Sequence, residues 1–174
     1  RQTFTPVSGE IVLDYYMRSD DLDREGVFIT LRGDAGSDLH IAFGNEAGGA
    51  NIRGFIGLFR DNGWSNQFLR YSAEKWYHVR RTLNTLTDSG SVYVAEVDPE
   101  TGIDITDTLG PTGTYNISEN ESSFASNTVI NEISVGTSGS QLADAYLDNL
   151  TISPPVGTLV LTNTIVAENL VGTG

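Results

Sequence analysis

A two-residue alternation of apolar and polar side chains constrains this fold more than any other feature of the sequence. The clearest case is the segment 10–18, whose odd positions are Ile11, Leu13, Tyr15 and Met17. Alternation of this kind places one set of side chains on one face of a β-strand, whereas a helix would need a period of 3.6. No stretch of the chain sustains that helical period over three turns. The chain is therefore predicted to be all-β.

Further short segments share this composition, with β-branched and aromatic residues bounded by turn residues. The other predicted strands are 27–32, 39–43, 55–60, 76–83, 92–97, 133–135 and 145–152. The segments 34–37, 61–63 and 88–90 combine Asp or Asn with Gly and predict tight turns. Many short strands joined by such turns predict an antiparallel two-sheet β-sandwich or jelly roll.

The length of 174 residues fits one domain with a substantial core. Pro154 and Pro155 end the predicted strand 145–152, because neither residue can donate to a sheet ladder. Residues 1–153 are therefore predicted to form the sandwich domain. Residues 154–174 are predicted to be a linker or an extra edge strand, with the linker favoured. The chain starts at Arg1 without a signal peptide, which indicates a mature or excised fragment.

The charge of the chain excludes two classes of partner. Ten basic residues oppose 23 acidic ones, for a net charge of -13, and no Lys or Arg follows Arg81. Nucleic acid and an anionic membrane would both be repelled by such a chain, so neither is an expected partner. The acidic surplus serves either solubility in a salty medium or the binding of divalent cations. Cysteine is absent, which excludes disulfides and thiolate metal sites.

Five segments carry a resemblance to a known group of folds. They are TFTPVSGEIVLDYYMRS at 3–19, GFIGLFRDNGW at 54–64, KWYHVR at 75–80, VYV at 92–94 and AYLDNLTI at 145–152. In order and spacing the chain resembles the concanavalin A-like, laminin-G-like jelly rolls that serve as carbohydrate-binding accessory domains in secreted bacterial polysaccharide-degrading enzymes. The strands KWYHVR and YLDNLTI are its most specific parts.

This resemblance implies a secreted, extracellular or cell-surface location and a non-catalytic domain that binds a polysaccharide or oligosaccharide. It also implies covalent linkage to further domains. Two alternatives stay open, because such sandwiches serve several functions. One is a structural or adhesive spacer in a surface protein. The other is a jelly-roll polysaccharide lyase.

Candidate carbohydrate-binding residues are found where aromatic and polar side chains gather. A pyranose ring packs on Trp or Tyr, while polar side chains bond its hydroxyl groups. Trp64 lies in a predicted hairpin loop, and strand alternation predicts that two polar residues of segment 76–83 share one face. The candidate set is Trp64, Arg60, Asp61, Asn62, Tyr71, His78 and Arg80. Trp76 is instead predicted to lie in the core.

Two candidate sites would bind calcium through hard oxygen ligands. Asp21, Asp23 and Glu25 are spaced at i, i+2 and i+4 before a glycine, like the start of an oxygen-rich calcium loop. The second site follows from the resemblance, in which an Asp of the closing strand binds a structural calcium with help from the opening strand. The corresponding residues here are Asp148 and Glu10.

No catalytic residue is predicted. The run Glu96-Val97-Asp98-Pro99-Glu100 looks like the E-x-D-x-E strand of laminarinase-type glucanases, which share the fold. However, Pro99 would interrupt the ladder, and the segment 98–102 predicts a hairpin turn rather than a strand. A lyase would depend on His40 or His78, the only histidines, and the sequence motifs expected of alginate lyases are absent. The tripeptide at 32–34, Arg-Gly-Asp, is attributed to a strand-to-turn junction rather than to adhesion.

Overall fold

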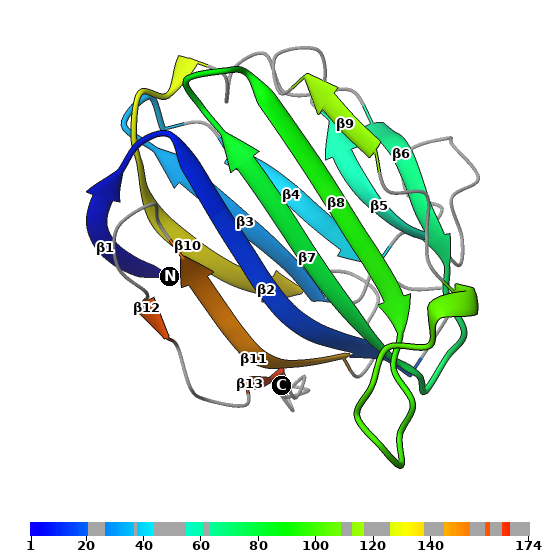
Figure 1. Cartoon of the computed structure of the whole chain (residues 1–174). Coiled ribbons are helices and arrows are strands. Elements are labelled where there is room, and N and C mark those ends of the chain that lie inside the picture. Colours follow the sequence, from blue (N-terminus) through cyan, green and yellow to red (C-terminus); the bar gives the residue numbers. More distant parts are fainter. Residues whose placement is uncertain are drawn as a thin grey trace.

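The chain forms two β-sheets that pack face to face, as the computed structural model shows (Figure 1). The structure describes residues 1–20, 27–36, 38–43, 55–60, 63–108, 113–116, 126–137, 145–153, 159–160 and 165–167. Within them the helical content is one 3-10 turn, η1, at Thr106–Thr108. No helix among these residues has the length and apolar character that crossing a membrane requires.

The back sheet has six strands in the order β1-β10-β3-β4-β5-β6. Their bounds are β1 Gln2–Val7, β10 Ile130–Thr137, β3 Val27–Gly33, β4 Asp38–Phe43, β5 Phe55–Arg60 and β6 Gly63–Arg70. Every pairing between them is antiparallel. Pro6 lies within β1, which is an edge strand and so tolerates a residue without an amide hydrogen.

The front sheet has seven strands, six of them in the order β12-β11-β2-β7-β8-β9, with β13 also paired to β11. Their bounds are β12 Leu159–Val160, β11 Ala145–Ser153, β2 Glu10–Ser19, β7 Trp76–Asn84, β8 Ser89–Glu96, β9 Gly113–Asn116 and β13 Ile165–Ala167. These pairings are antiparallel too, so the predicted two-sheet antiparallel sandwich is confirmed.

The core lies between the two sheets and follows the predicted alternation. In β2 the odd positions from Ile11 to Met17 are all at most 1% exposed, and they are the apolar residues that the sequence pattern selected. The buried positions of β7 alternate in the same way and include Tyr77 and Val79. Those of β8 alternate as far as Val94, and the next residue, Ala95, is buried too. One inward position of β7 breaks the apolar pattern, since Arg81 is 1% exposed. The remaining positions of these strands form the outer face of the front sheet.

A bulge in β11 changes which side chains point outward. The buried positions of this strand are Leu147, Leu150 and Ile152, each at most 3% exposed. The first two are three residues apart and the last two are two residues apart. The register with β2 shifts between Asp148 and Thr151. Asn149 has a φ of 52°, a left-handed conformation that Asn tolerates better than most residues. The extra residue leaves Asp148 and Asn149 together on the outer side of the strand.

Two short strands of the segment 154–174 lie against β11. Val160 of β12 is paired with Thr151, and Val166 of β13 is paired with Tyr146. Both pairings add backbone hydrogen bonds to β11, a strand that otherwise borders only β2. The domain boundary at residue 153 stays a prediction, because most of 154–174 lies outside the described residues.

Candidate functional site

The outer face of the front sheet gathers polar and aromatic side chains from β2, β7, β8 and β11. In β7, the half-buried or exposed positions Trp76, His78 and Arg80 alternate with buried ones. The register sets His78 opposite Tyr16 and Arg80 opposite Asp14. Antiparallel pairing therefore brings residues more than 60 positions apart in the chain onto one surface.

His78 lies at the centre of this face and is bonded at both ring nitrogens. Nδ1 lies 2.8 Å from Oδ2 of Asp104, and Nε2 lies 2.9 Å from Oδ1 of Asp14. Its ring stacks on Tyr16, with centroids 4.7 Å apart and planes 13° from parallel. Both ring nitrogens are therefore directed at carboxylates of the chain itself.

Two tyrosines of this cluster remain protonated at neutral pH. The hydroxyl of Tyr93 donates to Oδ2 of Asp104 at 2.6 Å. Burial, this hydrogen bond and the charge of Asp104 raise the pKa of Tyr93 to about 12. The pKa of Tyr16 is also raised, first by burial and then by the charges of Asp104 and Asp14. Both side chains thus contribute ring surface and neutral hydroxyl groups rather than bases.

The cations on or beside this face are paired with carboxylates. The ion pairs are Arg18 with Asp20 at 2.9 Å, Lys75 with Glu96 at 2.7 Å, and Arg80 with Asp14 at 3.9 Å. The bond to Glu96, followed by the charge of Glu96, raises the pKa of Lys75. Arg18 also lies 5.3 Å from the centre of the Tyr146 ring, within the range of a cation–π contact. These contacts leave the face with an acidic surplus.

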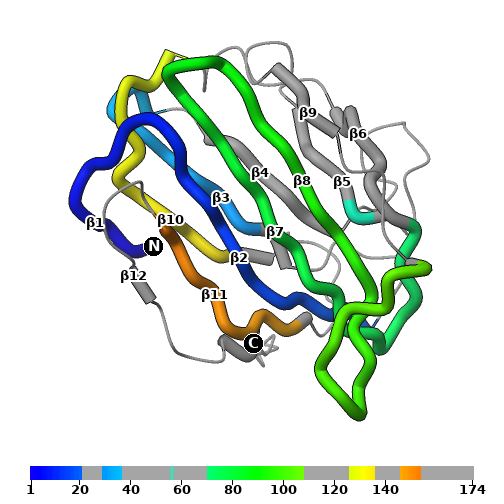
Figure 2. The backbone as a smooth tube through the Cα atoms, viewed as in Figure 1, coloured from blue at the N-terminus to red at the C-terminus, as the bar shows by residue number. Residues whose placement is uncertain are grey.

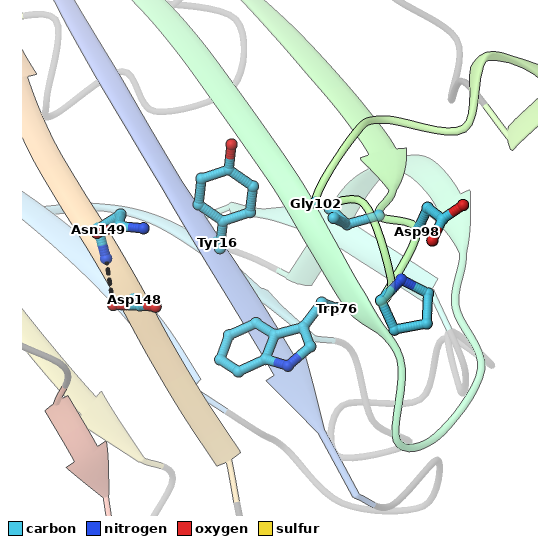
Figure 3. A pocket seen from close by; sticks show the side chains of 8 residues that line it. Tyr16, Trp76, Asp98, Gly102, Asp148 and Asn149 are labelled. Atoms are coloured by element: carbon cyan, nitrogen blue, oxygen red, sulfur yellow. Dashed lines mark hydrogen bonds between the residues drawn. The ribbon is translucent and has the colours of Figure 1, made fainter.

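A groove of about 310 Å³ opens beside this cluster (Figure 3). Tyr16 and Trp76 lie in its middle, between a loop and a strand bulge. Its lining is formed by Tyr16, Trp76, Val97, Asp98, Pro99, Gly102, Asp148 and Asn149. The volume is at the lower end of the range for ligand pockets. Rings, carboxylates and an amide are the groups that pack on a sugar ring and bond its hydroxyls.

One wall of the groove is the hairpin that follows β8, and it projects past the end of that strand (Figures 1 and 2). Oδ1 of Asp98 accepts from the amides of Glu100 and Thr101 at 2.8 and 3.2 Å. The carbonyl of Asp98 accepts from the amide of Gly102, which has a φ of 70°. Tight turns commonly contain an Asp whose side chain accepts hydrogen bonds from the backbone amides of the residues that follow it. The predicted hairpin turn at 98–102 is confirmed.

The opposite wall is the β11 bulge. Oδ1 of Asp148 accepts from the backbone amide of Asn149 at 2.9 Å. Because both residues point outward, the bulge offers a carboxylate and an amide where a regular strand would offer one side chain. In Figure 3 they lie across Tyr16 and Trp76 from the 98–102 hairpin.

Trp76 is half-buried on the outer face, so the prediction that it lies in the core is wrong. Its strand alternates as predicted, but the inward set begins at Tyr77, which is 1% exposed. Trp76 is opposite Arg18 in the register, and its ring lies 6.3 Å from that of Tyr146. A large ring at the start of a strand carries little information about which face it joins.

The predicted carbohydrate-binding residues divide between the two sheets. His78 and Arg80 share the outer face of the front sheet, as strand alternation predicted. Arg60 and Trp64 belong to β5 and β6 of the back sheet, and their side chains lie outside the described residues. Asp61 and Asn62 also lie outside the described residues.

Tyr71 requires a correction. It is 2% exposed and packs edge-on against Tyr77, with ring centroids 6.3 Å apart. A ring this deep in the core offers no face to a ligand. The sequence indicated an aromatic residue near Trp64 but carried no signal that the turn before β7 directs it inward.

The structure separates the two residues of one predicted calcium site. Asp148 lies opposite Tyr16, whereas Glu10 lies opposite Asn84, six residues earlier on β2. At about 3.3 Å per residue they are about 20 Å apart along the strand, so they do not bind one ion together. This prediction is wrong because the resemblance could not supply the register.

The other predicted calcium ligands, Asp21, Asp23 and Glu25, lie outside the described residues. Within the part of the chain that the structure describes, no three His, Cys, Asp or Glu side chains gather as a metal site.

The Arg-Gly-Asp tripeptide at 32–34 has an internal role. Oδ1 of Asp34 accepts from the amides of Thr128 and Val129 at 2.9 and 3.2 Å, and Oδ2 accepts from the Thr128 hydroxyl at 2.6 Å. A side chain at Gly33 would collide with the carbonyl of Val129 and with Asn127. The carboxylate therefore joins the end of β3 to the segment before β10.

No protein-family model matches the sequence, and no curated protein matches it. Solved structures, by contrast, match most of the chain. A sialidase superposes with a TM-score of 0.56 at 15% identity, over 87% of this chain and 14% of that one. Peanut lectin with a nine-residue peptide gives 0.55 at 9% identity, over 90% and 74%. Lectin UEA-II complexed with galactose gives 0.55 at 10% identity, over 86% and 77%.

The chain has the concanavalin A-like jelly-roll fold. Identities between 9% and 15% establish this fold and nothing more specific. The chain spans about a seventh of the sialidase and about three quarters of each lectin. Because one fold of this kind supports many functions, the function has to be argued from the groove.

Proposed function

We propose that this chain binds carbohydrate in the groove of Tyr16 and Trp76, on the outer face of the front sheet. The observation that carries the proposal is the combination of two aromatic rings with hydrogen-bonding side chains on both walls. Rings of this kind pack against the C–H face of a sugar while polar groups bond its hydroxyls. The fold shared with a lectin complexed with galactose supports it.

We propose further that binding is not followed by cleavage. Both nitrogens of His78 are bonded to carboxylates, and the raised pKa of Tyr93 makes it a weak candidate for a general base. Glu96 is paired with Lys75. Asp98 is part of a hairpin turn, so these two acids do not follow each other along a strand as glycosidase catalysis on this fold would need.

The wider context of the proposal follows from the sequence resemblance. The chain acts as an accessory domain of a larger secreted or cell-surface protein and brings that protein to a polysaccharide. Calcium binding is part of the proposal, at the loop of Asp21, Asp23 and Glu25, whose oxygen ligands suit that ion.

The test uses the two tryptophans of the chain, one on each sheet. In a Trp64→Phe variant the remaining indole is Trp76, so its fluorescence reports on the groove during titration with plant, algal and microbial polysaccharides. A saturable change is expected with at least one of them. Calorimetry on the complete chain should then show binding weakened about tenfold, or about 1.4 kcal/mol, by Trp76→Ala.

Trp64→Ala is the matched control and should leave the affinity unchanged. If Trp64→Ala abolished binding while Trp76→Ala did not, the binding site would lie at the β5–β6 hairpin instead. Absence of binding to every polysaccharide would overturn the proposal in favour of a structural spacer. Turnover that produces unsaturated uronate absorbance would overturn it in favour of a lyase.

A further inference from the structure

The hairpin wall of the groove is the segment 97–104, and little of it is buried. It projects past the end of β8 (Figures 1 and 2). Residues 99–103 are all exposed, and Ile103 is 67% exposed. A segment with so few buried contacts opens locally at a low cost in free energy, so this wall depends on specific bonds to keep its place. The groove-lining residues that it supplies are Val97, Asp98, Pro99 and Gly102.

Backbone hydrogen bonds fix the base of the hairpin. The amide of Val97 donates to the carbonyl of Trp76 at 2.9 Å, and the amide of Ile105 donates to the carbonyl of Glu96 at 2.8 Å. Val97 and Asp104 form an isolated antiparallel bridge. A two-stranded hairpin is marginally stable by itself, so its orientation beyond this base depends on side-chain contacts with the sheet.

Asp104, at the returning end of the hairpin, supplies such contacts. One of its oxygens, Oδ2, accepts from the hydroxyl of Tyr93 at 2.6 Å and lies 2.8 Å from Nδ1 of His78. The side chain of Asp104 is 22% exposed, so both contacts are partly shielded from water. Because Tyr93 belongs to β8 and His78 to β7, this one oxygen joins the hairpin to two strands of the front sheet.

The two partners of Asp104 are themselves held in place. The ring of His78 stacks on Tyr16, which lies in the middle of the groove, and its Nε2 lies 2.9 Å from Oδ1 of Asp14. Burial and the bond to Asp104 raise the pKa of Tyr93 to about 12, so its hydroxyl keeps the proton that it donates. Asp104 therefore connects the wall of the groove, through His78, to the ring of Tyr16.

A second attraction acts on the hairpin, but it is weaker. The pKa of Lys75 is raised first by its bond to Glu96 and, as the last of several causes, by the charge of Asp98. The side chain of Lys75 is 48% exposed, so solvent screens its attraction to Asp98. The better shielded Asp104 is the stronger anchor of the two.

We infer that Asp104 is a positioning residue of the groove, whose bonds to Tyr93 and His78 hold the hairpin wall beside Trp76 at the spacing that a sugar ring requires. This inference rests on the proposed carbohydrate binding. Asp104 is not among the residues that line the groove, so it acts through the wall rather than on the ligand. A site that loses its supporting contacts keeps its ligand-binding groups but becomes too loose to bind well.

The first measurement needs no ligand. In the Trp64→Phe background the remaining indole is Trp76, which shares the groove with the hairpin wall. Asp104→Ala should release the wall and raise the quenching of Trp76 fluorescence by acrylamide about 1.5-fold or more. Tyr93→Phe removes only one of the two bonds and should give a smaller rise. It keeps the question testable if Asp104→Ala does not fold.

Three further variants identify the cause of any change. In Asp104→Asn, an amide oxygen in the place of Oδ2 can still accept from the Tyr93 hydroxyl and from Nδ1–H of His78, so quenching should stay at the parent level. Asp107→Ala removes an exposed acid from the segment that follows and should have no effect. Asp34→Asn weakens the bonds beside the end of β3 in the back sheet. Unchanged quenching in this variant separates positioning of the wall from general stability.

Calorimetry on the complete chain then compares the same variants with a polysaccharide that the parent chain binds. Asp104→Ala should weaken binding about fivefold and Asp104→Asn less than about twofold. Unchanged quenching and affinity in Asp104→Ala would overturn the inference while the proposed function stands. An Asp104→Asn variant as impaired as Asp104→Ala would also overturn it, since charge rather than hydrogen bonds would then hold the wall. If no polysaccharide binds, the proposed function fails, and the quenching comparison decides whether Asp104 holds the wall.

Discussion

At the scale of single residues, the outer face of the front sheet depends on one imidazole that is shared by two acids. His78 contributes a hydrogen bond to Asp14 on β2 and another to Asp104 beyond β8, and its ring stacks on Tyr16. These contacts join β7 to β2 and to the segment that follows β8. The side chain of His78 is only 15% exposed, so its contacts contribute to the stability of this surface.

Replacement of His78 should therefore cost stability. His78→Ala removes both bonds and leaves two partly buried carboxylates facing each other, so the free energy of unfolding should fall by about 1–2 kcal/mol. Urea unfolding measures this loss. Arg80→Ala on the same strand is the control, because Arg80 is 59% exposed and 3.9 Å from Asp14, and its loss should stay below about 0.5 kcal/mol. Equal losses would contradict the central role of His78.

Asp34 provides a pH-dependent contribution at the same scale. Hydrogen bonds from Thr128 and Val129 hold the pKa of the Asp34 carboxyl below its ordinary value in the folded chain. A folded-state pKa below the unfolded one means that the contribution is present above the unfolded pKa and is lost as the pH falls through the folded pKa. Asn has one acceptor oxygen where Asp34 has two, so Asp34→Asn cannot accept both from the amides of Thr128 and Val129 and from the Thr128 hydroxyl. This variant should melt at a lower temperature than the parent chain at pH 7.

Thermal melting from pH 7 to pH 3 checks this expectation. The difference in melting temperature between the parent chain and Asp34→Asn should shrink as the pH falls into the acidic range. Asp107→Asn removes one exposed carboxylate and serves as the control for net charge. A difference that stays constant with pH would show that the carboxylate of Asp34 is not the source.

At the scale of elements, two irregularities build the groove on an otherwise regular sheet. The bulge in β11 turns two consecutive side chains outward, and the Asp98 turn folds the hairpin after β8 beside the sheet. A regular pair of strands would offer a flat surface at both places. Bulges often redirect side chains in this way at functional sites.

Asn149 is the residue on which the bulge depends. Its φ of 52° lies in the left-handed region, which β-branched residues strongly disfavour. Asn149→Val should therefore destabilise the chain by about 1–2 kcal/mol and also weaken glycan binding, since the outward pair is displaced. Asn149→Gly is the matched control, because glycine accepts this conformation and should preserve stability. Urea unfolding measures the stability of both variants. Equal stability would show that the bulge does not need a residue that tolerates the left-handed conformation.

At the scale of the whole molecule, the charge balance remains the dominant property. Every basic residue lies at or before Arg81, yet the sandwich topology spreads them over both sheets, with Arg1 on the back sheet and Arg80 on the front. Part of the acidic second half is neutralised through pairs such as Arg1 with Glu132. The surplus still implies self-repulsion, which a bound divalent cation would reduce.

Calcium should therefore stabilise the chain if the loop of Asp21, Asp23 and Glu25 binds it. An ion at a hundred times its Kd adds about 2.7 kcal/mol, which corresponds to a rise of about 5–10 °C in Tm for a domain of this size. Thermal melts in excess EDTA and then in millimolar calcium, at constant ionic strength, measure the shift. Asp21→Ala should abolish it, whereas Asp148→Ala should not. Identical melting temperatures with and without calcium would defeat the proposal.

The sequence by itself determined the fold class, most of the core and one wall of the groove. Local alternation shows which side chains of a strand share a face, because the period of two is a property of the backbone alone. The turn at 98–102 was equally local, since Asp98 bonds the amides of its own near neighbours. In YLDNLTI, the spacing of Leu147, Leu150 and Ile152 also carried the signal of the bulge, although the plain strand prediction did not use it.

Only the tertiary structure determined which strands are neighbours and which side chains form the groove. Periodicity does not say which strand is the neighbour, so the pairing of Tyr16 with His78 and the separation of Glu10 from Asp148 both required the register. Asp104 reaches His78 because a hairpin returns along β8, a path that no local pattern encodes. The groove exists because distant segments converge, and convergence is set by the packing of the whole sandwich rather than by any one strand.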